Sequence, residues 1–314
     1  MKSSNDAKHV ARCLELAILL EVGAHKPGNV SVITNFENTF YSHFLASAVA
    51  ASSSFEAAAQ KGIAVSKRKI DASDVGVGQI IKRCISDINT WQHGGNTLLG
   101  AVILLSPVAI AAGMISQTGN FDLQLLRRSL KRIIESTTPI DAVNMYAAIG
   151  IANPSGLGKA PALDVTDPNS VNRIIEEKIS LYEVFKIAEK YDSICSEWVN
   201  NYPITFDFAY PSLVKPLQLG GDPVHAIIQT FLEVLAEVPD TFITRKTGIQ
   251  KSREISLQAR QILDVGGVGT QVGRKRLKEF DKELRNASNI LNPGTTADII
   301  ATALALCVLG GYRP

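Results

Sequence analysis

The sequence predicts an all-α protein: one compact domain over residues 1–314, built from roughly ten to twelve helices joined by long functional loops. Three observations support this prediction. Apolar residues recur at three- and four-residue steps through most of the chain. No stretch alternates apolar and polar residues, as strands do, for more than a few positions. No repeat of fixed period divides the chain, so a single domain is the simplest arrangement.

The composition is that of a folded soluble protein. Hydrophobic residues make up 46% of the chain and charged residues 20%. Aromatic residues are only 6%, so aliphatic and alanine-rich helix packing must supply most of the core. The net charge is +2, and no basic patch is interleaved with aromatic residues. Nucleic acid and anionic membranes are therefore not the expected partners.

The cysteines and the N-terminus predict a cytoplasmic location. No CxxC pair is present and each cysteine lies among apolar residues, so we expect buried, reduced thiols and no cysteine zinc site. The first nine residues are polar and lack the apolar core of a signal peptide. The cysteines are Cys13, Cys84, Cys195 and Cys307.

One apolar segment is almost long enough to span a membrane, so it must be weighed against the prediction of a soluble protein. Residues 98–115 are apolar apart from Ser106, with Pro107 and glycines among them, which is at the short limit for a membrane span. No Lys/Arg cluster flanks the segment closely, and no second such segment occurs. We therefore predict a buried central helix, kinked near Pro107, and no membrane association.

Helical spacing and turn residues define the other elements. Proline and glycine mark many of the boundaries, because proline removes a backbone N–H and glycine favours turns. The predicted helices cover residues 12–22, 44–60, 74–91, 98–115, 121–137, 139–151, 174–200, 223–238, 252–263, 273–285 and 297–309.

Three Gly/Pro-containing segments, 153–168, 203–221 and 239–248, are predicted to be loops. The first is the most lid-like part of the chain, and any domain boundary is expected there. Asp164 and Asp167 lie within it, spaced as loop ligands often are. Two acids in a loop are also common turn formers, so both interpretations stay open.

The last predicted helix begins with a motif suited to phosphate. Asn292 opens an Asn-Pro-Gly turn, and Thr295 or Thr296 can cap the helix over 297–309. A helix start presents unpaired N–H groups and a partial positive charge, which favour a bound phosphate. Asp298 lies in the first turn, where it can hold a magnesium ion beside that phosphate. The same residues also fit an ordinary helix cap.

Two further turns carry polar side chains next to apolar helices. Lys26 and Asn29 flank a Pro-Gly turn that follows the first predicted helix, where an exposed loop with a solvated lysine is the alternative. His93, Asn96 and Thr97 lie in a glycine-rich turn before the helix over 98–115. Glycines there allow a close approach of backbone to ligand, although an Asn/Thr cap explains the turn equally well.

Acidic and basic residues occur together in two more places. Glu37 and His43 are the residues with chemical capacity between the first two helices, and His43 also fits a core histidine bonded to a carbonyl. Asp240, Arg245 and Lys246 follow a proline turn, and Arg/Lys pairs suit phosphate oxygens. A surface loop with mobile charges is the alternative interpretation of the segment that carries Asp240, Arg245 and Lys246.

Together these turns supply cations, amides, hydroxyls and acids beside apolar helix ends. The mixture favours a phosphate-rich ligand with a divalent metal over acyl chemistry, since no serine or cysteine lies in a nucleophile motif. No Walker loop or GxGxxG motif is present, so a standard NTPase or dehydrogenase is not expected.

Four motifs in order resemble those of the triphosphoribosyl-dephospho-CoA synthases, and more closely their archaeal-type homologues. The resemblance runs from about residue 12 to residue 310. The motifs are Leu-Glu-Val-x-x-x-Lys26-Pro27-Gly28-Asn29, Gly95-Asn96-Thr97-x-x-Gly100, Asp240-Thr241-x-x-x-Arg245-Lys246-x-Gly248 and Asn292-Pro-Gly-Thr-Thr-Ala-Asp298.

The resemblance implies an all-helical enzyme that uses ATP and Mg²⁺. It implies transfer of the triphosphoribosyl group of ATP to the 2′-hydroxyl of 3′-dephospho-CoA, or of a related acceptor, with release of adenine. The chain departs from the family pattern at two places. Leu98-Leu99 replaces the usual His-Lys pair after Asn-Thr, and the usual Gly-Ala-His-x-Asp-Met segment is missing around residues 36–43. A homo-oligomer is possible and is left open.

Under this resemblance we assign roles to the candidate residues. Lys26, Arg245 and Lys246 are predicted to bind phosphate. Glu37, Asp240 and Asp298 are predicted to hold magnesium or activate the attacking hydroxyl. Asn29, His93 and Asn96 are predicted to position ribose or base, and the remaining nucleotide-binding residues are Thr97, Asn292, Thr295 and Thr296. Two alternatives stay open: a ribosyl or nucleotide hydrolase with water as acceptor, and a non-catalytic helical nucleotide-binding protein.

Overall fold

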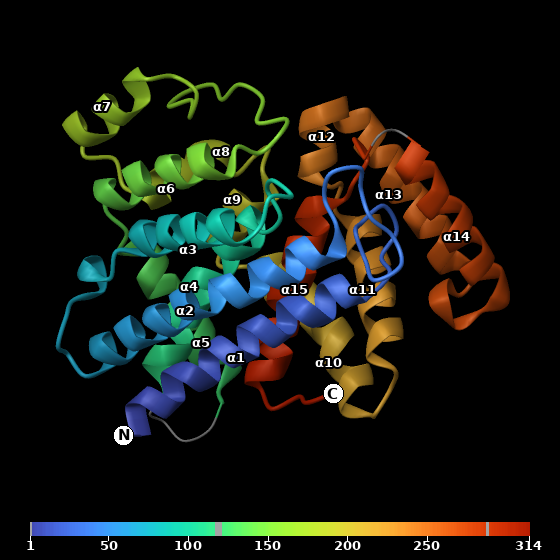
Figure 1. Cartoon of the computed structure of the whole chain (residues 1–314), viewed down its shortest axis with the longest axis horizontal. Coiled ribbons are helices and arrows are strands. Elements are labelled where there is room, and N and C mark those ends of the chain that lie inside the picture. The colour runs from blue at the N-terminus through green and yellow to red at the C-terminus, as the bar shows by residue number, and fades with distance from the viewer. Residues whose placement is uncertain (1, 117–120, 287–288) are drawn as a thin grey trace.

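The computed structural model describes residues 2–116, 121–286 and 289–314, and it confirms the all-α prediction (Figure 1). These ranges contain fifteen α-helices, more than the ten to twelve expected, and no β-strand; one isolated bridge joins Ser31 and Thr34. The helices are α1 (Lys2–Gly23), α2 (Tyr41–Ser66), α3 (Val77–Trp91), α4 (Leu99–Ile115), α5 (Leu123–Glu135), α6 (Pro139–Ala152), α7 (Asn169–Glu176), α8 (Leu181–Ala188), α9 (Ser193–Val199), α10 (Tyr210–Gln218), α11 (Pro223–Glu237), α12 (Thr241–Thr247), α13 (Ile249–Asp264), α14 (Gln271–Asn286) and α15 (Gly294–Leu309).

Helix α4 is the buried centre of the fold, as predicted for residues 98–115. Its side chains are apolar on every face, so it requires neighbours all round. Helices α1, α2, α3, α5 and α15 all pack against it. Within the part of the chain that the structure describes, no helix is long and apolar enough to cross a membrane.

The proline inside α4 explains one of two hydrogen bonds that side chains from outside the helix donate to its backbone. Pro107 has no N–H, so the carbonyl of Ile103, four residues earlier, lacks its helical donor. Trp198 Nε1 donates to that carbonyl at 3.1 Å. The Tyr202 hydroxyl donates to the next carbonyl, that of Leu104, at 2.9 Å. Side chains from α9 and the segment after it thus fix the central helix where its own bonding fails.

Two groups of helices flank this centre (Figure 1). Helices α6 to α9 lie on one side and α11 to α14 on the other, with α1, α2, α4 and α15 between them. Buried apolar side chains of both flanks belong to one hydrophobic cluster. Three of the four cysteines are buried and Cys195 is half-buried. The assignment of residues 1–314 to a single domain stays a prediction.

The long helix predicted over 174–200 is wrong. The structure has three short helices there, α7, α8 and α9, because capping residues start new helices within the apolar pattern. Ser180 Oγ accepts the backbone N–H of Glu183 at the start of α8. Asp192 accepts the N–H of Ile194 at the start of α9. The first helix also differs, since α1 begins at Lys2 and not at residue 12.

Two segments predicted to be loops are helical. Residues 203–221 contain a π-helical turn, Ile204–Ala209, followed directly by α10. Proline caused this error: Pro203 precedes the π-helical turn and Pro211 lies in the first turn of α10, where no N–H is needed. Residues 239–248 contain α12. The segment 153–168 has no regular structure until α7 begins, as predicted.

Glu197 predicts a pH dependence of stability. Its carboxylate is fully buried (0% exposed) and accepts the N–H groups of Ile204 and Thr205 at 2.8 and 2.9 Å. Burial raises its pKa from 4.5 to about 7, although these hydrogen bonds oppose the rise. The folded protein therefore binds the proton more tightly than the unfolded chain, and the stability that this proton gives is lost as pH rises from about 4.5 to 7.

The measurement is the free energy of unfolding of wild type and Glu197→Gln in urea between pH 4.5 and 8. The variant does not titrate at this position. We expect wild type to lose stability relative to the variant by an amount on the order of 3 kcal/mol across that window. A difference between the two proteins that does not change with pH would contradict this account.

Candidate functional site

A cavity of about 990 Å³ lies where several helix ends meet. The last turn of α1, the first turns of α4 and α15, and helix α12 contribute to its wall. The loop over residues 153–157 and the first turns after α1 complete it. Its walls therefore come from segments at both ends and the middle of the chain.

All four sequence motifs converge on this cavity. Each motif contributes at least two lining side chains, although the motifs are far apart in sequence. The predicted site residues that line it are Lys26, Asn29, Glu37, Asn96, Thr97, Arg245, Lys246, Asn292, Thr295 and Asp298. Three predicted residues, His93, Asp240 and Thr296, are not among the lining residues.

Asp240 is a buried junction behind the cavity wall, only 1% exposed. One carboxylate oxygen accepts the N–H groups of Phe242 and Ile243 at the start of α12. The other accepts the N–H and the hydroxyl of Thr296, at 2.7 and 2.8 Å, at the start of α15. Thr296 therefore does not cap its own helix; Asp240 does, from another segment. His93 is exposed on its turn.

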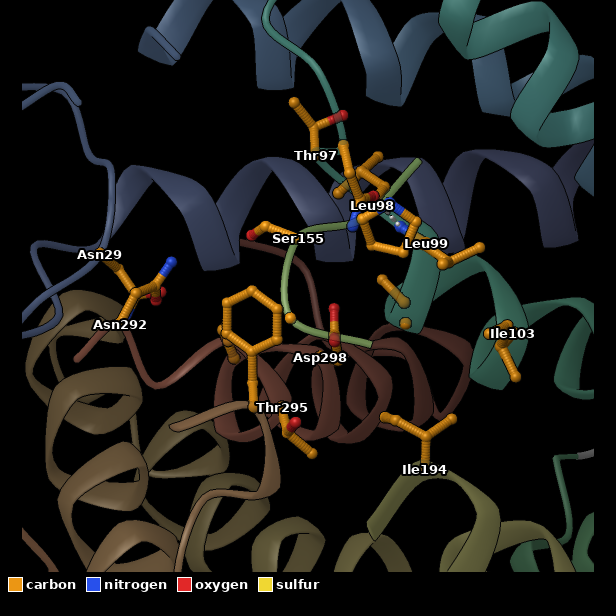
Figure 2. Close-up of a pocket in the computed structure, with 18 of the residues that line it drawn as sticks. Asn29, Thr97, Leu98, Leu99, Ile103, Ser155, Ile194, Asn292, Thr295 and Asp298 are labelled. Atoms are coloured by element: carbon orange, nitrogen blue, oxygen red, sulfur yellow. Dashed lines mark hydrogen bonds between the residues drawn. The ribbon is translucent and has the colours of Figure 1, made fainter. Parts of the chain in front are cut away.

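Asp298 lies in the middle of the cavity (Figure 2). Its carboxylate packs against Gly100, where a Cβ atom would lie 2.0 Å from Oδ2, so only glycine fits at the start of α4. The backbone N–H of Ala101 donates a hydrogen bond to it. Burial raises the pKa of Asp298 well above its ordinary value, and the nearby carboxylates of Glu21 and Asp240 add to the rise.

Lys26 is almost completely buried and pairs with a residue that the sequence did not suggest. Its ammonium lies 3.0 Å from the carboxylate of Glu21, which also lines the cavity. Burial lowers the pKa of Lys26 and raises that of Glu21, while the attraction between the two opposes both shifts. Glu21 belongs to the first of the four sequence motifs, five residues before Lys26, but the sequence analysis gave it no role.

Helix α12 presents the two other cations. Arg245 pairs with Asp192, a lining residue that also caps α9 and that the sequence analysis missed as a site residue. Both cations lie over the ring of Phe242, Arg245 at 5.6 Å and Lys246 at 3.7 Å from its centroid. Burial and the neighbouring charge of Arg245 lower the pKa of Lys246.

The predicted lid contributes residues 153–157 to the cavity wall. Gly156 has φ +72°, and a Cβ atom there would lie 2.8 Å from Cγ of Lys246, so this loop crosses directly over that side chain. The two loop acids are turn formers. Asp164 accepts the N–H groups of Ala160 and Thr166, and Asp167 accepts that of Asn169.

The region of residues 35–43 contributes one predicted carboxylate and one structural histidine. Glu37 is exposed at the cavity margin. His43 Nδ1 accepts the N–H of Phe40 at 3.0 Å, at the start of α2, and its ring packs against Gly94. This is a bonded histidine, as the alternative interpretation expected, although its partner is an N–H and not a carbonyl.

The two ends of the cavity differ in character (Figure 2). Asn29 and Asn292 face one end, while Leu99, Ile103 and Ile194 lie at the other. Further apolar side chains of α6 and α8 also line the cavity. The cavity therefore suits one or two ligands whose polar part lies at the end with the asparagines and whose apolar part lies at the other end. The two parts would meet near Asp298.

Acids slightly outnumber bases in the cavity. The charged side chains among its described lining residues are Lys26, Arg245 and Lys246 against Glu21, Glu37, Asp192 and Asp298. Over residues 2–116, 121–286 and 289–314, no three His, Cys, Asp or Glu side chains are grouped to hold a metal ion. The predicted trio of Glu37, Asp240 and Asp298 is thus not assembled, because Asp240 is bonded to helix N–H groups.

Comparison with known proteins assigns the chain to a family. The family described as ATP:dephospho-CoA triphosphoribosyl transferase matches residues 7–314. The chain belongs to this family. The cavity on which the four motifs converge is therefore found in a member of this transferase family.

Individual relatives are distant. A Pseudomonas savastanoi pv. phaseolicola protein named "Probable 2-(5''-triphosphoribosyl)-3'-dephosphocoenzyme-A synthase" is 31% identical over 105 residues, 33% of this chain and 35% of that protein. A Stutzerimonas stutzeri protein of the same name is 24% identical over 107 residues, 34% of this chain and 36% of that protein. The matched part thus spans only about a third of the length of these relatives.

A solved structure shares the fold. An Archaeoglobus fulgidus protein, whose structure is described as "Crystal structure of putative triphosphoribosyl-dephospho-coA synthase from Archaeoglobus fulgidus", superposes with a TM-score of 0.62 at 22% sequence identity. The match covers 86% of this chain and 100% of that chain. The overall helical fold is therefore shared with this archaeal protein.

We expect Asp240→Asn to destabilise the protein by about 3 kcal/mol. The amide would turn an N–H₂ group toward backbone donors of α12 or α15 and leave them unpaired. Urea unfolding measures the effect. The matched control is Asp222→Asn, since Asp222 caps α11 at the surface and asparagine caps equally well. Equal stability of the two variants would refute the junction role.

Asp281 predicts an acid-sensitive anchor for the first loop. It accepts the N–H of Gly28 at 2.8 Å, pairs with Arg285 at 2.9 Å and lies 3.5 Å from His25. Burial alone would raise its pKa, but these partners outweigh burial and lower it to about 2. The stability it contributes is present above its ordinary pKa of 3.8 and is lost as pH falls toward 2.

The test compares wild type with Asp281→Asn in urea from pH 7 down to pH 2. At neutral pH the charged wild type should be more stable by an amount on the order of 2 kcal/mol, and this advantage should vanish as the pH falls below 4. An advantage that persists at pH 2 would show that the charge of Asp281 does not anchor the loop.

Proposed function

We propose that this protein transfers the triphosphoribosyl group of ATP to the 2′-hydroxyl of 3′-dephospho-CoA, or of a related acceptor, and releases adenine. One observation carries the proposal: the four motifs of the family meet in one cavity. The four motifs are far apart along the chain, so their spacing in the sequence alone does not bring them together. A cavity of about 990 Å³ is at the upper end of the range for small-molecule sites, which suits two substrates.

The polar side of the cavity supports binding of the triphosphate. Arg245 and Lys246 lie together on α12, and Thr295 presents its hydroxyl at the start of α15. The positive end of a helix dipole and two cations are the usual partners of phosphate oxygens. Asn29 and Asn292, which also line the cavity, supply amides for hydroxyl groups of the ribose.

The charge balance of the cavity supports a role for Mg²⁺. Its described lining has more acids than bases, so the protein alone does not neutralise a triphosphate. Magnesium is commonly bound by one or two carboxylates together with substrate phosphates. In this proposal Glu37, at the cavity margin, would supply a carboxylate that holds the ion together with the phosphates, and the ion would neutralise and orient the triphosphate. Location in the cytoplasm stays a prediction.

The acidic centre of the cavity also suits the chemistry. Breaking the bond between ribose C1′ and adenine N9 leaves positive charge on the sugar, as in other glycosyl transfers. Fixed carboxylates beside that carbon stabilise the charge as it develops. Asp298, in the middle of the cavity, and Glu21, on the wall formed by α1, are placed for this role.

Release of adenine from ATP, with Mg²⁺ and dephospho-CoA, tests the proposal by chromatography and mass spectrometry. We expect a product that joins triphosphoribose to dephospho-CoA. Adenine with free triphosphoribose, formed without an acceptor, would assign a hydrolase instead. ATP binding without any adenine release would leave a non-catalytic nucleotide-binding protein and overturn the transferase proposal.

Asp298→Asn should lower kcat for adenine release by about 100-fold, because it removes a charge at the reacting centre. Asp87→Asn is the matched control, since Asp87 belongs to an exposed ion pair on α3 and should leave kcat unchanged. An Asp298→Asn protein that is folded by circular dichroism and turns over at the wild-type rate would remove Asp298 from the mechanism.

A further inference from the structure

The ammonium group of Lys26 is fully occupied by the protein itself. It donates to the carbonyl oxygen of Glu21 and, at 3.0 Å, to that of Ala24, and it pairs with the Glu21 carboxylate at 3.0 Å. An ammonium has three N–H groups; the two carbonyls take two of them, and the remaining one lies in the ion pair with the Glu21 carboxylate. The side chain is 1% exposed. Lys26 therefore has no donor left for a phosphate, in contrast to its predicted role.

The Glu21 carboxylate, unlike Lys26, retains capacity to bind a ligand. It is 7% exposed and lines the cavity from the last turn of α1. Among the described residues, Lys26 is the only cation paired with it, and Oε1 is buried without a hydrogen bond of good geometry. No hydrogen bond or ion pair within the described residues engages the other oxygen, Oε2, so this oxygen keeps its acceptor positions for a ligand in the cavity.

The position of Glu21 relative to Asp298 suits a hydroxyl group bound between them. Helices α1 and α15, which carry the two residues, pack against each other. Both side chains line the same cavity, and the charge of Glu21 contributes to the raised pKa of Asp298. Enzymes that break glycosidic bonds commonly use a pair of carboxyl groups at the sugar, one of which can take the proton of the attacking hydroxyl.

We propose that Glu21 is the catalytic base of this cavity and that Lys26 is the positioning residue that holds it. The proposal rests on the triphosphoribosyl transfer proposed above. Glu21 accepts the proton of the acceptor's 2′-hydroxyl as the bond from that oxygen to ribose C1′ forms. The bond from C1′ to adenine N9 breaks, and its electron pair leaves with adenine, which takes a proton from water. Glu21 then returns its proton to solvent.

Steady-state kinetics and ATP binding of three variants test this assignment. Glu21→Gln keeps the shape of the side chain but cannot accept a proton, so kcat should fall about 100-fold. Its affinity for ATP with Mg²⁺, measured by calorimetry, should stay within about twofold of wild type. Lys26→Met should also lower kcat and leave KM for ATP unchanged, because the lysine acts only through Glu21.

The double variant Glu21→Gln/Lys26→Met separates positioning from phosphate binding. If Lys26 acts only through Glu21, the double variant has the kcat and the ATP affinity of Glu21→Gln alone. If Lys26 binds phosphate, the double variant loses about tenfold or more in ATP affinity relative to Glu21→Gln, which overturns its positioning role. Removing both charges also avoids leaving one of them buried alone, so this variant should fold even where Lys26→Met does not.

Lys251→Met is the matched control, since Lys251 pairs with Glu254 at the surface and should change none of these values. The two proposals fail in different ways. Wild type that releases no adenine overturns the proposed function, and the role of Glu21 falls with it. An active wild type together with an equally active Glu21→Gln protein overturns this inference alone.

Discussion

The structure depends on one buried carboxylate. Asp240 accepts hydrogen bonds from the starts of two helices at once, α12 and α15. Its backbone carbonyl also accepts the hydroxyl of Ser252, which joins α13 to the same point. Two helix dipoles end at this charge, so it is stabilised without a paired cation. Because α12 carries Arg245 and Lys246 and α15 carries Asp298, this junction sets the spacing between the cationic and acidic parts of the cavity.

The cavity is built from charges that are already paired and held. Lys26 fixes Glu21, Asp192 fixes Arg245, and the ring of Phe242 supports both cations of α12. Charged groups that are fixed before the substrate arrives do not have to reorganise during the reaction, which is the main source of electrostatic catalysis. Each family motif joins a tight turn to a charged or amide side chain for the same reason: the turn fixes the backbone that carries the group.

Sequence reasoning reached the fold class and most of the cavity lining, but not the partners of each residue. Helical periodicity and the uniformly apolar segment over 98–115 depend on local pattern, so they were read directly. Asp240 was placed among the metal ligands because it lies in a motif that resembles one of the family's. Its true partner, Thr296, lies 56 residues away, and spacing alone does not reveal such a contact. Glu21 was given no role, although it lies in the same motif as Lys26, because the motif alone does not show that the lysine folds back onto this carboxylate.

The departure of this chain from the family pattern bears on the acceptor. Leu98 and Leu99, in place of the usual His-Lys pair, are buried and line the cavity near Ile103. A charged group of a substrate placed there would lose its hydration without gaining a partner, which costs several kcal/mol. Under the proposed transfer, the phosphates of both substrates therefore lie away from Leu98 and Leu99 and beside the cations Arg245 and Lys246 of α12. The apolar end then takes an uncharged part of ATP or of the acceptor, and the exclusion of water there strengthens the electrostatic effect of Asp298 and Glu21 on the reacting sugar.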